Sequence, residues 1–269
     1  MALLTSQQIA RFYELFSTIN VTFTKDVITG LGLIPKQIFL RCLGNQWPCI
    51  IYSTSMTQAK IIASVSTDLF EKIRDANNLV SLRFSFKGEG KKGPISFFLS
   101  GKITGFTPYS KENKALNFIS LDYTQRPPDD LIAILGRLLE ANITSKKRKE
   151  DRIDLSPDAI GKLGIKNKTT FIQIDGIPRK CMLRDLSFSG AKVIVPGVAK
   201  FLVNKEAKLF LEFEDVEKPV HMEGIILRYE EVSGRKDLAA LAVQYDEKKT
   251  PAEYKLRLND YFNLLKKGR

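Results

Sequence analysis

Short runs of apolar and β-branched residues, separated by turn-forming segments, recur along most of the chain and restrict the fold to one built mainly from strands. A first series occupies residues 37–123 and a second occupies residues 169–247. Within the second series, Asp175-Gly176 is a strong hairpin signal, because both residues tolerate the positive φ angles of a tight turn. We expect a small β-barrel in the first half, and a second barrel or a sandwich in the other half.

Helical spacing of apolar residues marks the segments that flank these strands. The chain opens with a T-x-x-Q capping box at Thr5 and Gln8, and a second amphipathic segment follows the strand-breaking sequence QRPPDD at residues 125–130. Further helices are predicted at residues 156–165 and after the capping box at residues 250–253. The expected fold class is therefore mainly β with flanking helices: two small β-barrel domains, each closed by a helix and joined by a basic linker.

The expected linker is the segment SKKRKEDR at residues 145–152. Nearly all of its residues are charged, so it has little apolar surface to bury in a core. We place the domain boundary here, which gives an N-terminal domain at residues 1–143 and a C-terminal domain at residues 144–269.

The composition argues against a metal site and against common hydrolase chemistry. The three cysteines, Cys42, Cys49 and Cys181, lack the spacing of metal ligands, and His221 is the single histidine. Neither a P-loop motif nor a G-x-S-x-G nucleophile elbow occurs. We therefore predict buried thiols, no metal or other cofactor, and no enzymatic activity.

Membrane insertion and export are not indicated by the sequence. The opening segment MALLTSQQIARFYELF lacks the basic, apolar and small-residue regions of a signal peptide. Nowhere do about 18 apolar residues follow one another, as a membrane-spanning helix requires. We expect a cytoplasmic protein without a membrane span.

The net charge is +12, and both halves of the chain are basic. Such a charge attracts anionic partners over a range that salt shortens. Nucleotides, nucleic acid and a membrane surface all fit this property. The glycine motif GEGKKG at residues 88–93 does not choose among them, because the segment after it reads as a strand, whereas a phosphate-binding glycine loop opens a helix. We interpret this motif as a solvated hairpin tip.

Two arginines in the basic segment are spaced to act together. Arg148 and Arg152 stand four residues apart, so a helical turn or a tight loop would place both guanidinium groups on one side. Each guanidinium can bind phosphate oxygens, or the O6 and N7 atoms of guanine, through two parallel hydrogen bonds. A ligand that contains both guanine and phosphate would suit such a pair.

The segment DLSFSG at residues 185–190 adds polar residues to the end of an apparently buried strand. In an extended chain, Asp185, Ser187 and Ser189 share one face, while Leu186 and Phe188 point the other way. Exposed polar faces commonly contact solvent, but this one also has the groups needed to contact a ligand.

R-x-x-x-R followed by D-x-S-x-x-G, in this order and in a β-barrel context, is the signature of the PilZ domain, a bacterial receptor for cyclic di-GMP. The chain resembles this family over about residues 145–265, at Arg148, Arg152, Asp185, Ser187 and Gly190. The spacer between the two motifs is slightly longer than is usual in the family, and the helix predicted at residues 156–165 would absorb the excess. The N-terminal half is similar in layout to the PilZ-like or YcgR-N-like domains that precede some receptors.

The resemblance implies that these five residues bind cyclic di-GMP, and their chemistry agrees with that role. The Asp185 carboxylate can accept hydrogen bonds from N1 and N2 of guanine, while the arginines can donate to O6, N7 and phosphate. Gly190, which has no Cβ, lets the backbone turn or lie close against a base. Lys147 occupies a position that influences ligand stoichiometry in the family. Candidate additional contacts are Lys146, Lys147, Lys149, Ser189, Arg184 and Arg228.

These observations predict a non-enzymatic, two-domain cyclic di-GMP receptor. The expected mechanism is that the basic linker becomes ordered around the ligand, changes the arrangement of the domains and creates a surface for an unidentified downstream protein. The alternative is a nucleic-acid-binding protein that uses its basic surface, in which the motif residues occur by chance. The two functions are also compatible with each other.

Overall fold

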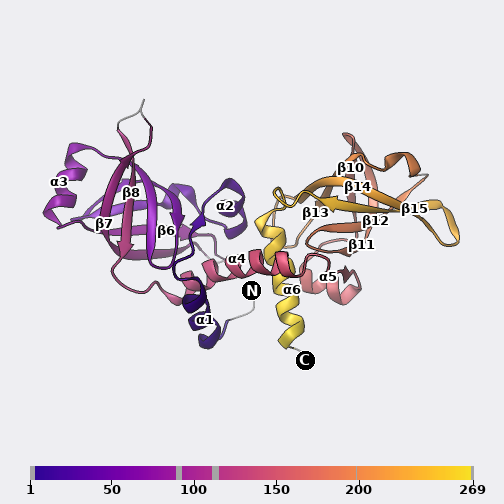
Figure 1. Cartoon of the computed structure of the whole chain (residues 1–269), viewed down its shortest axis with the longest axis horizontal. Helices are drawn as coiled ribbons and strands as arrows, with labels where there is room; N and C mark the ends of the chain where they lie inside the picture. The colour runs from indigo at the N-terminus through magenta and orange to yellow at the C-terminus, as the bar shows by residue number, and fades with distance from the viewer. Residues whose placement is uncertain (1–3, 89–92, 111–114, 198, 268–269) are drawn as a thin grey trace. The chain divides into compact units, whose positions relative to one another are not determined.

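The computed structural model describes residues 4–88, 93–110, 115–197 and 199–267. It divides into two compact units, Met1–Leu139 and Glu140–Arg269. The division falls within helix α4 (Asp129–Lys147), which is labelled in Figure 1. The domain limits 1–143 and 144–269 given above stay a prediction.

An eight-stranded sheet forms the framework of the first unit, with the strand order β1-β4-β5-β8-β7-β6-β2-β3 and antiparallel pairing throughout. It is an open half-barrel with β1 and β3 at its edges. In chain order the strands span Val21–Thr22, Phe39–Cys42, Asn45–Pro48, Ile50–Thr54, Gln58–Ser64, Leu79–Phe86, Ile95–Pro108 and Leu116–Tyr123. The pairing of β6 with β7 confirms the predicted hairpin, while residues 89–92 of its GEGKKG tip lie outside the described residues.

The helices of the first unit are α1 (Ser6–Phe16), α2 (Lys25–Leu31), η1 (Pro35–Gln37), α3 (Thr67–Asp75) and the first part of α4. Thr5 and Gln8 form the predicted capping box of α1, since the amide of Gln8 donates to the Thr5 hydroxyl and the amide of Thr5 donates to the Gln8 side chain. Helix α4 buries its apolar residues at the spacing expected from the sequence: Leu131, Ile132, Leu135 and Leu138.

A closed β-barrel forms the second unit. Its strands follow one another in the ring β10-β13-β14-β15-β12-β11, which the pairing of β10 with β11 closes, and β9 adds to β11 outside the ring. From β9 to β15 the strands span Ile153–Asp154, Thr169–Ile174, Ile177–Leu186, Gly190–Pro196, Glu206–Leu211, Val220–Val232 and Arg235–Tyr245. Of the two folds expected for the second half, a barrel or a sandwich, the structure shows the barrel. The mainly β fold class with flanking helices is confirmed for the chain.

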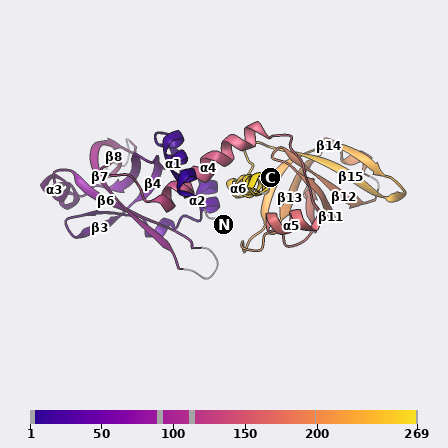
Figure 2. The ribbon, with the colours of Figure 1, turned by 90° about the horizontal axis from the view of Figure 1, so that it is seen from below.

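Helices α5 (Pro157–Leu163), η2 (Lys200–Leu202) and α6 (Ala252–Lys267) complete the second unit; α5 and α6 are labelled in Figure 2. The buried side chains of α6 join the hydrophobic core of the barrel, which confirms that a helix closes this domain. Helix α5 starts behind a Ser156 cap and occupies the extra length between the two motifs, as predicted.

The three cysteines are buried and unpaired, as predicted. Burial raises the pKa of Cys49 and of Cys181 to about 12, so both thiols are protonated at neutral pH. No group of three or more metal-binding side chains occurs within the described ranges. Of the helices that the structure describes, none is both long and apolar enough to cross a membrane.

Candidate ligand-binding site

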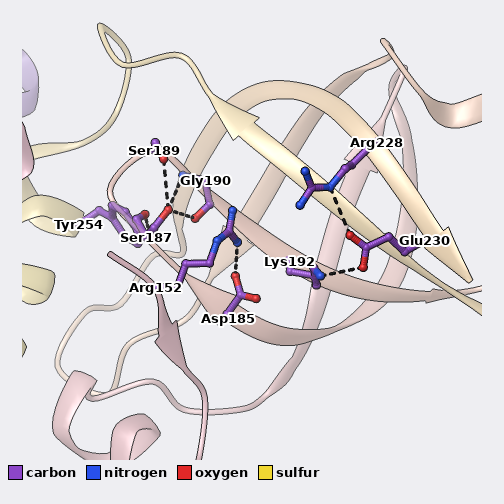
Figure 3. Close-up of polar contacts among 9 residues, drawn as sticks. All are labelled: Arg152, Asp185, Ser187, Ser189, Gly190, Lys192, Arg228, Glu230 and Tyr254. Carbon is purple, nitrogen blue, oxygen red and sulfur yellow. Dashed lines mark hydrogen bonds and ion pairs between the residues drawn. The ribbon is translucent and has the colours of Figure 1, made fainter. Parts of the chain in front are cut away.

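An ion pair joins the two sequence motifs. Arg152 immediately precedes β9, and β9 pairs with the end of β11 so that Ile153 lies opposite Leu186 and Asp154 opposite Asp185. The Nη1 atom of Arg152 donates a hydrogen bond of 2.6 Å to Oδ1 of Asp185 (Figure 3). The short strand β9 therefore brings together two residues that are far apart in the sequence.

The two members of this pair differ in exposure. Only 8% of the Asp185 side chain is exposed, against 40% of the Arg152 side chain. A carboxylate buried to this degree needs a hydrogen-bonded counter-charge, which Arg152 supplies. Because a guanidinium has several N–H donors in a planar fork, the exposed part of Arg152 can still contact a ligand.

Arg148 reaches the second motif through aromatic side chains. Its guanidinium lies 4.9 Å from the ring centre of Phe262 on α6, and that ring stacks on Phe188 in the DLSFSG segment with 5.9 Å between ring centres. The side chain also forms a weak ion pair with Asp151, with 3.4 Å between Nη1 and Oδ2. The contacts differ from those of Arg152, but both arginines connect to the same segment.

The basic segment forms the end of a helix and a turn instead of one extended linker. Lys146 and Lys147 lie exposed in the last turn of α4, and the amide of Arg148 still donates to the carbonyl of Thr144. The chain then turns before β9 begins at Ile153. Residues 145–152 therefore do not form a continuous extended linker. The end of α4 and the turn after it fix the backbone positions of Arg148 and Arg152.

The expectation that Asp185, Ser187 and Ser189 share one polar face is wrong, because β11 ends at Leu186 and a tight turn follows. The amide of Ser187 donates to the carbonyl of Gly190 at 2.8 Å, and the amide of Gly190 donates to the Ser187 hydroxyl at 3.1 Å. The Ser187 side chain is fully buried. Its hydroxyl thus closes the turn instead of lining an open face.

Helix α6 supports this turn from the interior. The buried hydroxyl of Tyr254 donates to the carbonyl of Ser187 at 2.7 Å, as Figure 3 shows. Burial raises the pKa of Tyr254 well above its usual value, so the hydroxyl keeps its proton for this hydrogen bond. Tyr254 belongs to neither sequence motif, and only the folded chain shows that it binds the DLSFSG turn.

Gly190 is required by the packing of neighbouring strands. It lies opposite Gln244 in the pairing of β12 with β15, and a Cβ atom at this position would collide with the carbonyl oxygen of Val243. The expected close approach is therefore to the protein's own backbone. The last two motif residues, Ser187 and Gly190, act on the shape of the turn.

A row of side chains leads from the ion pair across the outside of the barrel. The strand register places Asp185 opposite Lys192, Lys192 opposite Ala242, and Ala242 opposite Arg228. Paired residues point to the same face of a sheet, so the small Ala242 separates two cations. Glu230 binds both of them, at 2.8 Å from Lys192 and 3.2 Å from Arg228 (Figure 3).

Lys192 and Glu230 were not identified from the sequence. No motif marks either residue, and the signal that relates them to Asp185 is the register of β11, β12, β15 and β14. The hydrogen bond from Lys192 is the main cause that lowers the pKa of Glu230. This carboxylate is therefore ionised at neutral pH and offsets the charge of Lys192 and Arg228.

The other basic candidates surround the turn less closely. Lys149 pairs with Glu247 at 3.0 Å, and both line a pocket of about 280 Å³ together with Phe188 and the half-buried Ser189. Arg184 is exposed at a bulge of β11, where its carbonyl accepts a hydrogen bond from the amide of Leu155.

Comparisons with known proteins agree with this arrangement. Residues 7–142 match the PilZN3 domain family, and residues 146–262 match the PilZ domain family. The chain belongs to the PilZ family. The resemblance stated from the sequence is thus confirmed, and the N-terminal domain, expected to be PilZ-like or YcgR-N-like, is of the PilZN3 type.

One relative and two solved structures match this chain over most of its length. A protein of Treponema denticola named "Cyclic di-GMP binding protein" is 47% identical over 267 residues, which cover 99% of this chain and 85% of the relative. Among solved structures, the Borreliella burgdorferi PlzA protein in complex with c-di-GMP is 27% identical, with a TM-score of 0.43 and coverage of 97% of this chain and 100% of PlzA. Escherichia coli YcgR in complex with c-di-GMP is 14% identical, with a TM-score of 0.31 and coverage of 90% and 91%.

The packing of Gly190 gives a prediction about stability. We expect Gly190→Ala to lower the free energy of unfolding by about 1–3 kcal/mol, because the added methyl group forces the strand backbones apart. The matched control is Gly161→Ala, at an exposed position of helix α5 with open space around the new methyl group. This change should raise the free energy of unfolding by about 0.5–1 kcal/mol. Urea unfolding followed by circular dichroism measures both, and equal effects of the two changes would contradict the packing role.

Proposed function

We propose that this chain is a non-enzymatic receptor for cyclic di-GMP and that its PilZ domain binds the dinucleotide. The observation that carries the proposal is the Arg152–Asp185 ion pair, which puts a donor fork and an acceptor carboxylate 2.6 Å apart at the junction of the two motifs. The name of the Treponema denticola relative, which is 47% identical, supports the same ligand.

Each proposed contact follows from the chemistry of guanine and phosphate. Asp185 accepts from N1 and N2 of guanine, and since a carboxylate has several lone pairs it can keep its bond to Arg152 meanwhile. Arg152 and Arg148 donate to O6, N7 or phosphate oxygens. Ser187 and Gly190 contribute by holding the turn that follows Asp185, as their buried hydrogen bonds and packing support.

The cations beyond Asp185 provide a second place for phosphate. Lys192 and Arg228 lie along the same row of the barrel surface, and both bind Glu230 in the free protein. A phosphate that reaches them must compete with this carboxylate. We therefore assign Lys192 and Arg228 to the outer part of the site, where they strengthen binding less than Arg152 does.

We further propose that binding changes the arrangement of the two units and thereby signals to a partner protein. Arg148 follows the last turn of α4, and the division between the units falls within that same helix. A ligand that draws Arg148 away from Phe262 would alter the end of α4. Because a helix transmits a change at its end along its axis, we assign α4 as the coupling element between the units.

Isothermal titration of cyclic di-GMP at near-physiological salt tests the receptor function. We expect saturable binding that Arg152→Ala and Asp185→Ala each weaken about 10- to 100-fold, because charged hydrogen bonds contribute about 1.5–3 kcal/mol each. Arg235→Ala is the matched control, since Arg235 is exposed and pairs with Asp237 of its own strand. It should leave the affinity unchanged.

One further variant guards against a folding artefact in this titration. Arg152→Lys keeps the counter-charge of Asp185 but removes the planar fork, so it should fold and still bind more weakly than the wild type. A folded wild-type protein that does not bind cyclic di-GMP would refute the proposal. Equal affinities of Arg152→Lys, Asp185→Ala and the wild type would refute the assigned site.

Small-angle X-ray scattering tests the conformational part. The full chain should give different scattering profiles with and without saturating cyclic di-GMP, and the double variant Arg148→Ala/Arg152→Ala should give one profile under both conditions. Identical wild-type profiles, in a sample whose titration shows bound ligand, would eliminate a large-scale rearrangement of the units.

A further inference from the structure

A second cationic surface occurs in the first unit, on the outer face of the half-barrel. The strand register places Phe39 of β2 opposite Arg83 of β6, and Arg83 opposite Phe98 of β7. In the next row on the same face, Arg41 lies opposite Ser81 and Ser81 lies opposite Ser100. We name the set Phe39, Arg41, Ser81, Arg83, Phe98 and Ser100 the β2-β6-β7 face. Strands β3, β6 and β7 of this sheet are labelled in Figure 2.

Both arginines of this face stack on one aromatic ring. The guanidinium carbons of Arg41 and Arg83 lie 5.6 and 5.7 Å from the ring centre of Phe98, which is 48% exposed. Arg83 also lies 5.9 Å from the ring centre of Phe39. Such stacking orients the guanidinium planes and leaves their N–H edges for hydrogen bonds.

Neither arginine is neutralised within the part of the chain that the structure describes. The ion pairs found there do not include Arg41 or Arg83, and the buried Nε atom of Arg83 has no hydrogen-bond partner among the described residues. Residues diagonal to each other on neighbouring strands have Cα atoms about 7–8 Å apart, so two like charges here repel. This repulsion favours binding of an anion, whose charge offsets both guanidinium groups.

A shallow hollow that is largely open to solvent adjoins the stacked arginines. It has a volume of about 610 Å³, and its walls include Arg41, Ser81 and Ser100 of the β2-β6-β7 face together with the exposed apolar side chains of Leu43 and Leu79. The serine hydroxyls can both donate and accept hydrogen bonds, while the leucines offer apolar surface. A planar base with polar edges matches these walls.

A cation beside an aromatic ring also occurs on the outer side of the same sheet beyond the β2-β6-β7 face. Lys102 lies opposite Asp122, and Lys60 lies opposite Ser120, so the register puts both lysines on the outer side. The ammonium nitrogen of Lys60 is 4.7 Å from the ring centre of Phe118, which contacts the exposed Tyr52 and Tyr109. Cations beside aromatic rings thus occur at two places on one sheet face, as suits an extended ligand.

We propose that the β2-β6-β7 face binds single-stranded nucleic acid. Arg41 and Arg83 bind phosphates, and a base enters the hollow between Leu79 and the serines. Grooves that bind single strands combine cations, which follow the backbone, with aromatic platforms for bases. An acidic protein segment would match the arginines but would leave the aromatic rings and the hydroxyl-lined hollow without a specific role.

Fluorescence anisotropy of labelled single-stranded RNA and DNA 20-mers, titrated with the full-length protein, tests this site. We expect Arg41→Gln/Arg83→Gln to weaken binding at least tenfold. The slope of log affinity against log salt should also fall by about 1.4, since two phosphate contacts are lost. The control Arg11→Gln/Arg74→Gln removes the same charge from exposed positions of the same unit and should change affinity less than twofold.

Two further measurements make the result decisive. Arg83 packs between aromatic rings, so the single variant Arg41→Gln, at an exposed position, should weaken binding by itself even if the double variant is less stable. Duplex DNA should bind more weakly than either single strand, because its bases are not available to the hollow. No binding by the wild type, or equal losses in the test and control pairs, would overturn the proposal. Its failure would leave the cyclic di-GMP titration unaffected, because that site uses residues of the other unit.

Discussion

The ion pair between Arg152 and Asp185 is the interaction on which the candidate site depends. It fastens the short strand β9 to the end of β11, next to the start of the turn that Ser187 and Gly190 close. A buried carboxylate without a partner costs several kcal/mol, so breaking the pair would destabilise the fold. Under the proposed function, the free protein holds the guanine acceptor Asp185 and the phosphate donor Arg152 together before any ligand arrives.

The remaining motif residues act through the backbone. The Ser187 hydroxyl accepts a hydrogen bond from the amide of Gly190, and the Tyr254 hydroxyl donates one to the carbonyl of Ser187. The lack of a Cβ at Gly190 lets β12 lie close to the carbonyl of Val243. The D-x-S-x-x-G pattern therefore joins the Asp185 carboxylate, the proposed guanine acceptor, to a turn whose shape is set from the interior. Such a division is physically reasonable, because a fixed turn lowers the entropy that binding must remove.

Much of this could be predicted from the sequence, and the errors have physical causes. Periodicity and capping residues predicted helices α1, α4, α5 and α6 and the two series of strands, and the order of the motifs identified the family. Helices α2 and α3 were missed, and α3 lies inside the segment that was expected to contain only strands. The polar face at residues 185–189 was wrong because alternation assumes that the strand continues, whereas β11 ends at Leu186. Lys192 and Glu230 were missed because cross-strand neighbours depend on register, and a β-bulge between Leu183 and Asp185 shifts that register. Arg41 and Arg83 were missed for the same reason, because only the strand register brings them to one face of the sheet.

A crystal structure of the chain with cyclic di-GMP tests the central claim most directly. The account predicts a guanine edge on the Asp185 carboxylate, with Arg152 in contact with the same nucleotide and the turn at residues 187–190 unchanged. A ligand bound elsewhere on the chain, with the Arg152–Asp185 pair intact and remote from it, would contradict the account.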